Sequence, residues 1–169
     1  IMPSLVGSEM CIRDSTHALA YFQCHNFNEE FKFKEFSITF KRAGHILGAA
    51  SPIIKNTESS IQFSGDLGRF NDLMMKEPEM AASEVQNICM ESTYGNRLHP
   101  HNYARENMIQ VLEENQSKKG TILIPAFSVG RSQVTMLLLY QLFEERSDLK
   151  IPVYHDSAMT SKVNEVYLK

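Results

Sequence analysis

The sequence has no excess of positive charge and no long apolar run. Its 17 Lys and Arg against 20 Asp and Glu give a net charge of −3 at pH 7, so no basic field would attract nucleic acid to the surface as a whole. Attraction for RNA or DNA must therefore be local, as at a bound divalent metal ion. The longest apolar stretch, around Met136 to Tyr140, is too short to span a bilayer, which argues against a membrane protein.

Cysteine is also scarce. Cys11, Cys24 and Cys89 form no CxxC pair and their number is odd, which supports neither a disulfide framework nor a zinc knuckle. A reducing, cytoplasmic location is the simplest interpretation. With 43% hydrophobic and 22% charged residues, the composition is that of a globular protein, and 169 residues suffice for one domain or for parts of two.

The first half of the chain is predicted to be rich in strands. Apolar and polar residues alternate over 36–42, the period of a half-buried strand. A polar turn at 57–59 separates two further strand-like segments and predicts a hairpin. The expected elements are a short helix over 16–23, strands over 36–42, 51–55 and 60–64, a loop with a short helix over 69–83, and a buried strand over 85–90.

The second half alternates between helical and strand patterns, which predicts a parallel sheet and a mixed α/β protein. Lys118-Lys119-Gly120 is a typical helix end, and Ser157 is a typical N-cap. The expected elements are helices over 102–114 and 132–143, strands over 121–125 and 151–154, and a helix from 157. We place a change of domain between 117 and 120.

Three polar side chains follow apolar strands in glycine-rich or tight turns. His45 lies between Gly44 and Gly48, Asp66 follows Gly65, and Glu91 follows the apolar run that begins at 85. Imidazole and carboxylate are ligands that Zn²⁺ takes, and a carboxylate beside them can act in acid–base catalysis or orient a ligand. A core histidine, an Asx turn and a solvent-facing strand end are the structural alternatives for these three residues.

The segment 127–132 lies between a predicted strand and a predicted helix. Backbone N–H groups at a helix start favour an anion such as phosphate, and Arg131 can add a charge-assisted contact. Ser128, Gly130 and Arg131 are therefore candidate phosphate or RNA contacts. A plain connection with Arg131 in a salt bridge is the alternative.

Both ends of the sequence are unusual. Residues 1–15 show no clear period and resemble a translated adapter sequence, so we expect them to be non-native. The last expected helix is still continuing at Lys169, which favours a fragment.

Taken together, four motifs resemble the β-CASP branch of the metallo-β-lactamase superfamily, which includes RNA-processing nucleases. The motifs are Ala43–Ala50, Gly65-Asp66, Glu91–Gly95 and Pro125–Gln133. The resemblance implies part of an αββα metallo-β-lactamase sandwich over 16–118, followed by the start of a β-CASP domain over 119–169.

The same resemblance implies residue roles and a reaction. His45 would bind zinc, Asp66 would bridge two zinc ions, and Glu91 would support a catalytic histidine. The chemistry would be two-metal hydrolysis of a phosphodiester, with RNA as the partner, DNA left open, and a homodimer or an RNA-processing complex as the assembly.

The sequence departs from the family pattern in its ligand set. No HxHxDH motif is present, and the two later histidine motifs are also missing. We therefore expect this polypeptide to be an inactive fragment of a zinc nuclease. A non-catalytic β-CASP scaffold and a lactamase-fold hydrolase of small esters are the alternatives, although the segment from 121 onward argues against the latter.

Overall fold

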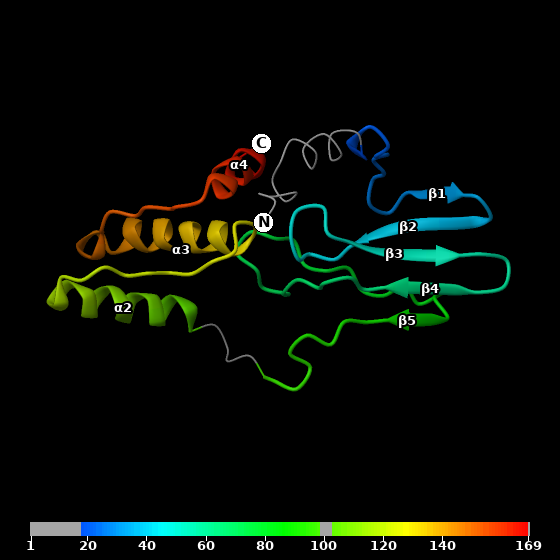
Figure 1. Ribbon diagram of the computed structural model, residues 1–169. Coiled ribbons are helices and arrows are strands. Elements are labelled where there is room, and N and C mark those ends of the chain that lie inside the picture. Colours follow the sequence, from blue (N-terminus) through cyan, green and yellow to red (C-terminus); the bar gives the residue numbers. More distant parts are fainter. Residues whose placement is uncertain (1–17, 99–102, 169) are drawn as a thin grey trace, which may run out of the picture.

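The computed structural model describes residues 18–98 and 103–168 as a mixed α/β structure. Five strands form a single sheet in the order β1-β2-β3-β4-β5, and helices gather beside one end of it (Figure 1). The strands are β1 (Glu30–Phe33), β2 (Phe36–Arg42), β3 (Ala50–Lys55), β4 (Ser60–Phe63) and β5 (Asn87–Cys89). The mixed α/β class expected from the sequence is confirmed.

The strand over 36–42 and the hairpin that follows it are confirmed. β2 pairs antiparallel with β3, and β3 pairs antiparallel with β4. The polar turn between β3 and β4 is closed by Asn56, whose side-chain oxygen accepts hydrogen bonds from the N–H groups of Glu58 and Ser59. β1 was not expected from the sequence; it pairs with β2, and Phe31 in it stacks on His25 with ring centroids 3.6 Å apart.

The cross-strand register places most of the apolar side chains on one face of the sheet. Phe31 lies opposite Ile38, Ile38 opposite Ile54, and Ile54 opposite Ile61. The opposite face is more polar and is covered by the loop over 71–86. There Gln62 is buried, donates to Ser51 Oγ at 2.9 Å and accepts from Ala82 N at 3.3 Å.

The expectation of a buried strand over 85–90 is wrong in its burial. β5 is the parallel partner of β4, but it lies at the edge of the sheet and all three of its residues are exposed. An apolar run becomes buried only when other elements cover it, and Ile88 remains 49% exposed. In the loop over 69–83 the structure shows turns and bends but no helix.

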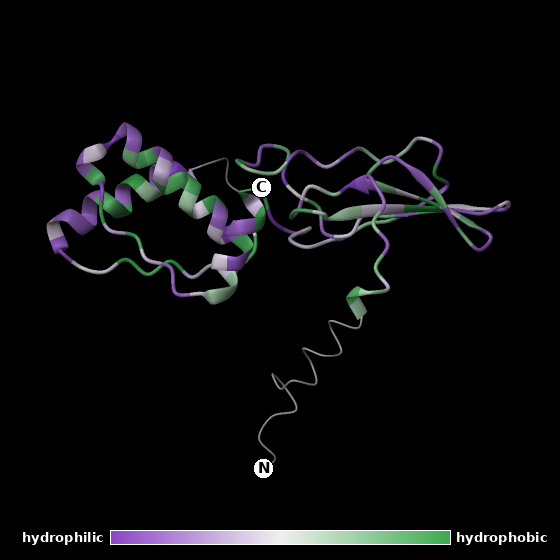
Figure 2. Ribbon diagram, turned by 90° about the horizontal axis from the view of Figure 1, so that it is seen from above, coloured by the Kyte–Doolittle hydropathy of each residue, from purple (hydrophilic) through white to green (hydrophobic). Residues whose placement is uncertain are grey.

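The second half contains helices α2 (Ala104–Lys118), α3 (Arg131–Glu145) and α4 (Ala158–Tyr167), with a short 3₁₀ helix, η1 (Ser147–Leu149). Their common core is leucine-rich. It consists of Leu112, Leu138, Leu139, Leu142 and Leu149, with Ile122 and Ile151 packed against it. Figure 2 shows these helices as a group separate from the sheet.

The strands expected over 121–125 and 151–154 are absent, and so is the parallel sheet they were to form. Both segments lack regular secondary structure and have mostly exposed residues. A strand requires a hydrogen-bonding partner, and neither segment has one among the described residues. One apolar residue of each segment, Ile122 and Ile151, packs against the leucine core instead.

The helix ends agree better with the expectations from the sequence than the strands of this half do. Lys119 closes α2 in the left-handed conformation, with φ 51°, and donates to Asn115 O. Ser157 caps α4, as expected. Of the helix expected over 16–23, Ala18 and Leu19 are helical and a turn follows at 20–21, while residues 1–17 lie outside the described part. No helix in the described ranges is both long and apolar enough to cross a membrane.

Candidate metal centre

His45 is presented by the loop between β2 and β3. Ala43 anchors the loop, since its side chain is fully buried and its N–H donates to Ala49 O at 3.0 Å. Gly44 has φ +71°, and a Cβ there would lie 2.7 Å from Lys76 O, so a side chain cannot be accommodated. The backbone around His45 is therefore fixed by contacts that only small residues permit.

Asp66 is presented by the turn that follows β4. Ser64 N donates to Cys89 O at 2.9 Å, and Gly65 takes φ +57° to reverse the chain. Three residues after Gly65, Gly68 N donates to Ala43 O at 2.8 Å, which joins this turn to the His45 loop. A Cβ on Gly68 would lie only 1.9 Å from Gly44 O. The two loops are thus in direct backbone contact.

This contact brings the two predicted metal ligands together. His45 Nε2 lies 4.0 Å from Asp66 Oδ2, and the side chains are 48% and 75% exposed, respectively. Zinc bonds to imidazole nitrogen and carboxylate oxygen at about 2.0–2.2 Å, so two donors of one tetrahedral ion lie about 3.4 Å apart. A small side-chain rotation would place these two atoms on one ion.

Glu91 forms hydrogen bonds with the turn that carries Asp66. Its carboxylate accepts a hydrogen bond from Leu67 N at 2.5 Å, and its own N–H donates to Ser64 Oγ at 2.9 Å. The bond from Leu67 N, followed by one from the Thr93 side chain, keeps the pKa of Glu91 below its ordinary value, and the charge of His45 acts in the same direction. The Glu91 side chain is therefore an ionised carboxylate that stabilises the turn carrying Asp66.

Ser64 is the site residue that the sequence analysis missed. Its hydroxyl accepts from Glu91 N and donates to Gly65 O at 2.7 Å, so it links β5 to the Asp66 turn. The available signal was a serine immediately before a Gly-Asp turn, a position where hydroxyls commonly bond to local backbone.

The donor types fit zinc, but the donor number does not complete a site. A catalytic zinc has three protein ligands, and the described residues contain no group of three or more His, Cys, Asp or Glu side chains able to hold a metal ion. His99 and His101 lie outside the described residues. His45 and Asp66 therefore supply two of the three protein donors that a catalytic zinc site would need.

The turn over 127–130 lies against the His45 loop. Gly130 has φ +80°, and a Cβ built on it would be 3.4 Å from Ile46 Cγ2. Ser128 Oγ lies 3.2 Å from Ser157 Oγ, and its carbonyl accepts from Gln133. The N–H groups of Arg131 and Ser132 already donate to Val129 O and Phe127 O, so these two donors at the helix start are not available to an anion.

Arg131 does not form a structural salt bridge with any described residue. It is exposed and has no acidic partner within 4.0 Å among the described residues. Its guanidinium is thus the group of this turn that can contact an external anion.

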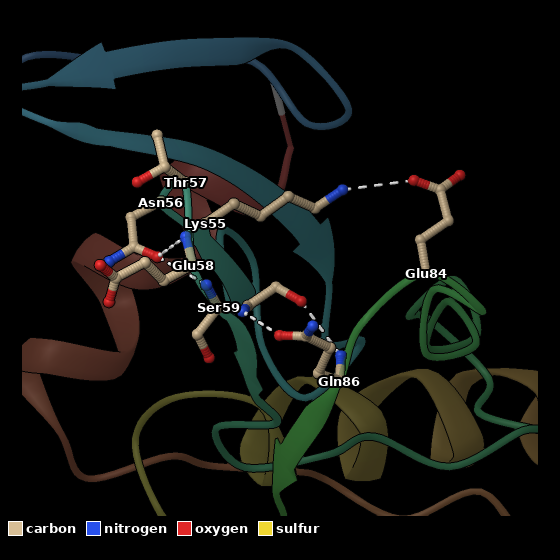
Figure 3. Close-up of a pocket in the computed structure, with 8 residues that line it drawn as sticks. Lys55, Asn56, Thr57, Glu58, Ser59, Glu84 and Gln86 are labelled. Carbon is tan, nitrogen blue, oxygen red and sulfur yellow. Dashed lines mark hydrogen bonds and ion pairs between the residues drawn. The ribbon is translucent and has the colours of Figure 1, made fainter.

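The pocket drawn in Figure 3 is not part of this site. It lies around the turn between β3 and β4, at the opposite end of those strands from His45. The Lys55–Glu84 ion pair at 3.3 Å borders it, and the Ser60 N–H donates to the Gln86 side chain at 3.0 Å. Its polar groups are largely paired with one another.

Comparison with known proteins places these motifs in a family. No family model matches the chain. Cleavage and polyadenylation specificity factor 73 of Drosophila melanogaster is 32% identical over 144 residues, which cover 84% of this chain and 21% of that protein. Ribonuclease TTHA0252 of Thermus thermophilus is 30% identical over 156 residues, covering 91% of this chain and 35% of that protein.

Integrator complex subunit 11 of Danio rerio is 32% identical over 134 residues, covering 79% of this chain and 22% of that protein. The chain is a β-CASP metallo-β-lactamase homologue. It spans between about a fifth and about a third of the length of these relatives. The β-CASP resemblance drawn from the four motifs is confirmed.

Proposed function

We propose that this β-CASP homologue forms part of a zinc-dependent RNA-processing nuclease that hydrolyses phosphodiester bonds by a two-metal mechanism. The observation that carries the proposal is the approach of His45 Nε2 and Asp66 Oδ2 to 4.0 Å, from two loops joined by the Gly68–Ala43 hydrogen bond. The names of its relatives, which include a ribonuclease and endoribonucleases, support the reaction class.

Each residue has a distinct task in this proposal. His45 and Asp66 hold metal, and Glu91 holds the Leu67 N–H so that the Asp66 carboxylate keeps its position. Bound zinc would lower the pKa of water and offset negative charge on a phosphate. Arg131, beside the His45 loop, contacts the RNA backbone through a charge-assisted hydrogen bond.

Because only two ligands are present, we propose that the 169-residue chain binds zinc weakly and does not cleave RNA. Isothermal titration of the purified chain with zinc tests the site. Substitution of His45→Ala or Asp66→Asn should remove the binding, whereas the matched control His155→Ala should leave it unchanged. Robust metal-dependent cleavage of RNA by this chain would contradict the proposed inactivity.

In a longer protein that holds this sequence and the remaining ligands, Asp66→Asn should abolish cleavage with little effect on folding, because the shape of the side chain is kept. Wild-type turnover at matched zinc would remove Asp66 from the site. Arg131→Ala should weaken RNA binding more than zinc binding. A change in thermal stability alone would assign Arg131 a structural role.

A non-catalytic β-CASP scaffold is the second candidate. Such a scaffold has no need of metal ligands, so the presence of both His45 and Asp66 favours the nuclease over it. The two candidates differ in what the longer protein does. A scaffold binds RNA or protein partners and shows no cleavage at saturating zinc.

A further inference from the structure

The loop that follows Glu91 is built from two consecutive tight turns. Gly95 N donates to Ser92 O at 2.9 Å, and Arg97 N donates to Tyr94 O at 2.8 Å. A Cβ on Gly95 would lie 2.5 Å from Ser92 Oγ, so the first turn closes tightly on itself. The turns fix where the side chains of Tyr94 and Arg97 project.

Tyr94 occupies an unfavourable backbone conformation for a bulky residue. Its φ is +60°, in the left-handed region that glycine and asparagine usually fill. The same residue is 53% exposed. A backbone conformation of this kind is retained where surrounding contacts impose it, and such positions are concentrated at binding and catalytic sites.

Arg97 lies over the ring of Tyr94. Its guanidinium carbon is 5.8 Å from the ring centroid, within the range of a cation–π interaction, and Arg97 is exposed. The pair therefore offers an aromatic surface and a fork of hydrogen-bond donors at one place. Aromatic stacking combined with a cation is the means by which proteins bind single-stranded nucleic acid without reading its sequence.

A short stretch of chain and one hydrogen bond connect this pair to the candidate metal ligands. Tyr94 lies three residues after Glu91 in the chain. Glu91 in turn holds Leu67 N, directly after Asp66. The Tyr94–Arg97 pair thus lies on the loop that follows Glu91, the residue whose hydrogen bond to Leu67 N helps to position Asp66.

We propose that Tyr94 and Arg97 form a stacking platform for one base of single-stranded RNA beside the metal centre. The inference rests on the proposed function and adds a substrate-binding element to it. A base stacks on the exposed part of the Tyr94 ring, and the Arg97 guanidinium donates to the adjacent phosphate. The platform positions substrate and takes no part in bond cleavage.

The test is binding of fluorescein-labelled oligouridylate to the 169-residue chain in EDTA, followed by fluorescence anisotropy. Tyr94→Leu removes the ring and should raise Kd about tenfold, the effect of losing one stacked base. Tyr94→Phe keeps the ring and should retain the affinity. Tyr140→Leu is the matched control, because Tyr140 is 63% exposed and lies on α3.

An abasic ribose-phosphate oligomer of the same length separates stacking from charge. Wild type should bind it about tenfold more weakly than oligouridylate, and Tyr94→Leu should not discriminate between the two. If wild type binds oligouridylate and Tyr94→Leu binds it equally well, the platform is refuted while the proposed function stands. If wild type binds neither oligomer, the platform is refuted and RNA binding by this part of the proposed nuclease is refuted with it.

Discussion

At the scale of single residues, the candidate metal centre depends on glycines that let two loops touch. Gly44 and Gly68 face each other so closely that a Cβ on Gly68 would lie 1.9 Å from Gly44 O. The backbone bond from Gly68 N to Ala43 O then fixes the spacing of the loops. The positions of His45 and Asp66 are therefore set by backbone packing rather than by contacts of their own side chains.

We predict that Gly68→Ala separates these loops. The added methyl group overlaps a backbone oxygen that cannot move independently, a class of overpacking that costs about 1–3 kcal/mol. The amide of residue 68 should then exchange with deuterium about 5- to 150-fold faster, as measured by NMR or mass spectrometry. Gly120→Ala is the control, because a Cβ there makes an ordinary 3.4 Å contact with Asn115 Oδ1. Equal exchange in both variants would contradict the close packing.

Glu91 gives a prediction about pH. Its pKa in the folded chain is below the ordinary value of 4.5, chiefly because Leu67 N donates to the carboxylate. The unfolded chain thus binds the proton more readily than the folded one, and the stability due to Glu91 is present above pH 4.5 and is lost as the pH falls through the lower folded value. Glu91→Gln removes this titration while keeping an acceptor for Leu67 N.

The difference in thermal unfolding midpoint between wild type and Glu91→Gln should therefore be largest near pH 7 and should shrink as the pH is lowered through the folded pKa. Circular dichroism at a series of pH values measures it. A difference that stays constant across the series would show that the carboxylate charge does not hold the Asp66 turn.

At the scale of elements, the helix termini are stabilised by a few local bonds. Ser157 begins α4 with its Oγ accepting from Thr160 N at 3.1 Å, and it also lies 3.2 Å from Ser128 Oγ. The cap thus connects α4 to the turn that precedes α3. That turn packs on Ile46 through Gly130, so a helix cap in the second half is linked to the loop that carries His45.

We predict that Ser157→Ala destabilises the helical half by about 1 kcal/mol, the usual loss for an N-cap. Urea unfolding followed at the helical circular dichroism signal measures the change. Ser157→Asp should recover most of it, since a carboxylate also caps Thr160 N. If Ser157→Ala unfolds at the same urea concentration as wild type, the cap is not a stabilising contact.

At the scale of the whole molecule, many large apolar side chains of the described residues remain exposed. Phe33 and Phe63 on the apolar face of the sheet remain 59% and 40% exposed. The leucine core of the helices is separate from this face.

We predict that the purified chain binds a hydrophobic dye such as ANS under native conditions and unfolds over a broad temperature range. The apolar face of the sheet is largely exposed, so it binds the dye and buries little apolar area to stabilise the sheet. Without a shared core the sheet and the helices need not unfold together. Dye fluorescence and scanning calorimetry provide the measurement. A single sharp calorimetric transition without dye binding would show that the apolar face is covered.

The sequence by itself determined the local elements and the identity of the donors. The strand over 36–42, the hairpin after it, the cap at Ser157 and the close of α2 at Lys118 depend on residues within a few positions of one another, and all are confirmed. His45, Asp66 and Glu91 could be selected because an imidazole or a carboxylate after an apolar strand is chemically recognisable.

The tertiary structure alone decided where those residues meet and which segments become strands. The contact of Gly68 with Ala43, and that of Glu91 with Leu67, join positions more than twenty residues apart, and no local pattern encodes such a pairing. The segments 121–125 and 151–154 have strand-like composition but no strand partner among the described residues, and only Ile122 and Ile151 of them pack on the leucine core. Pairing and burial are decided between distant parts of a chain, because a strand is stable only when another strand satisfies its hydrogen bonds.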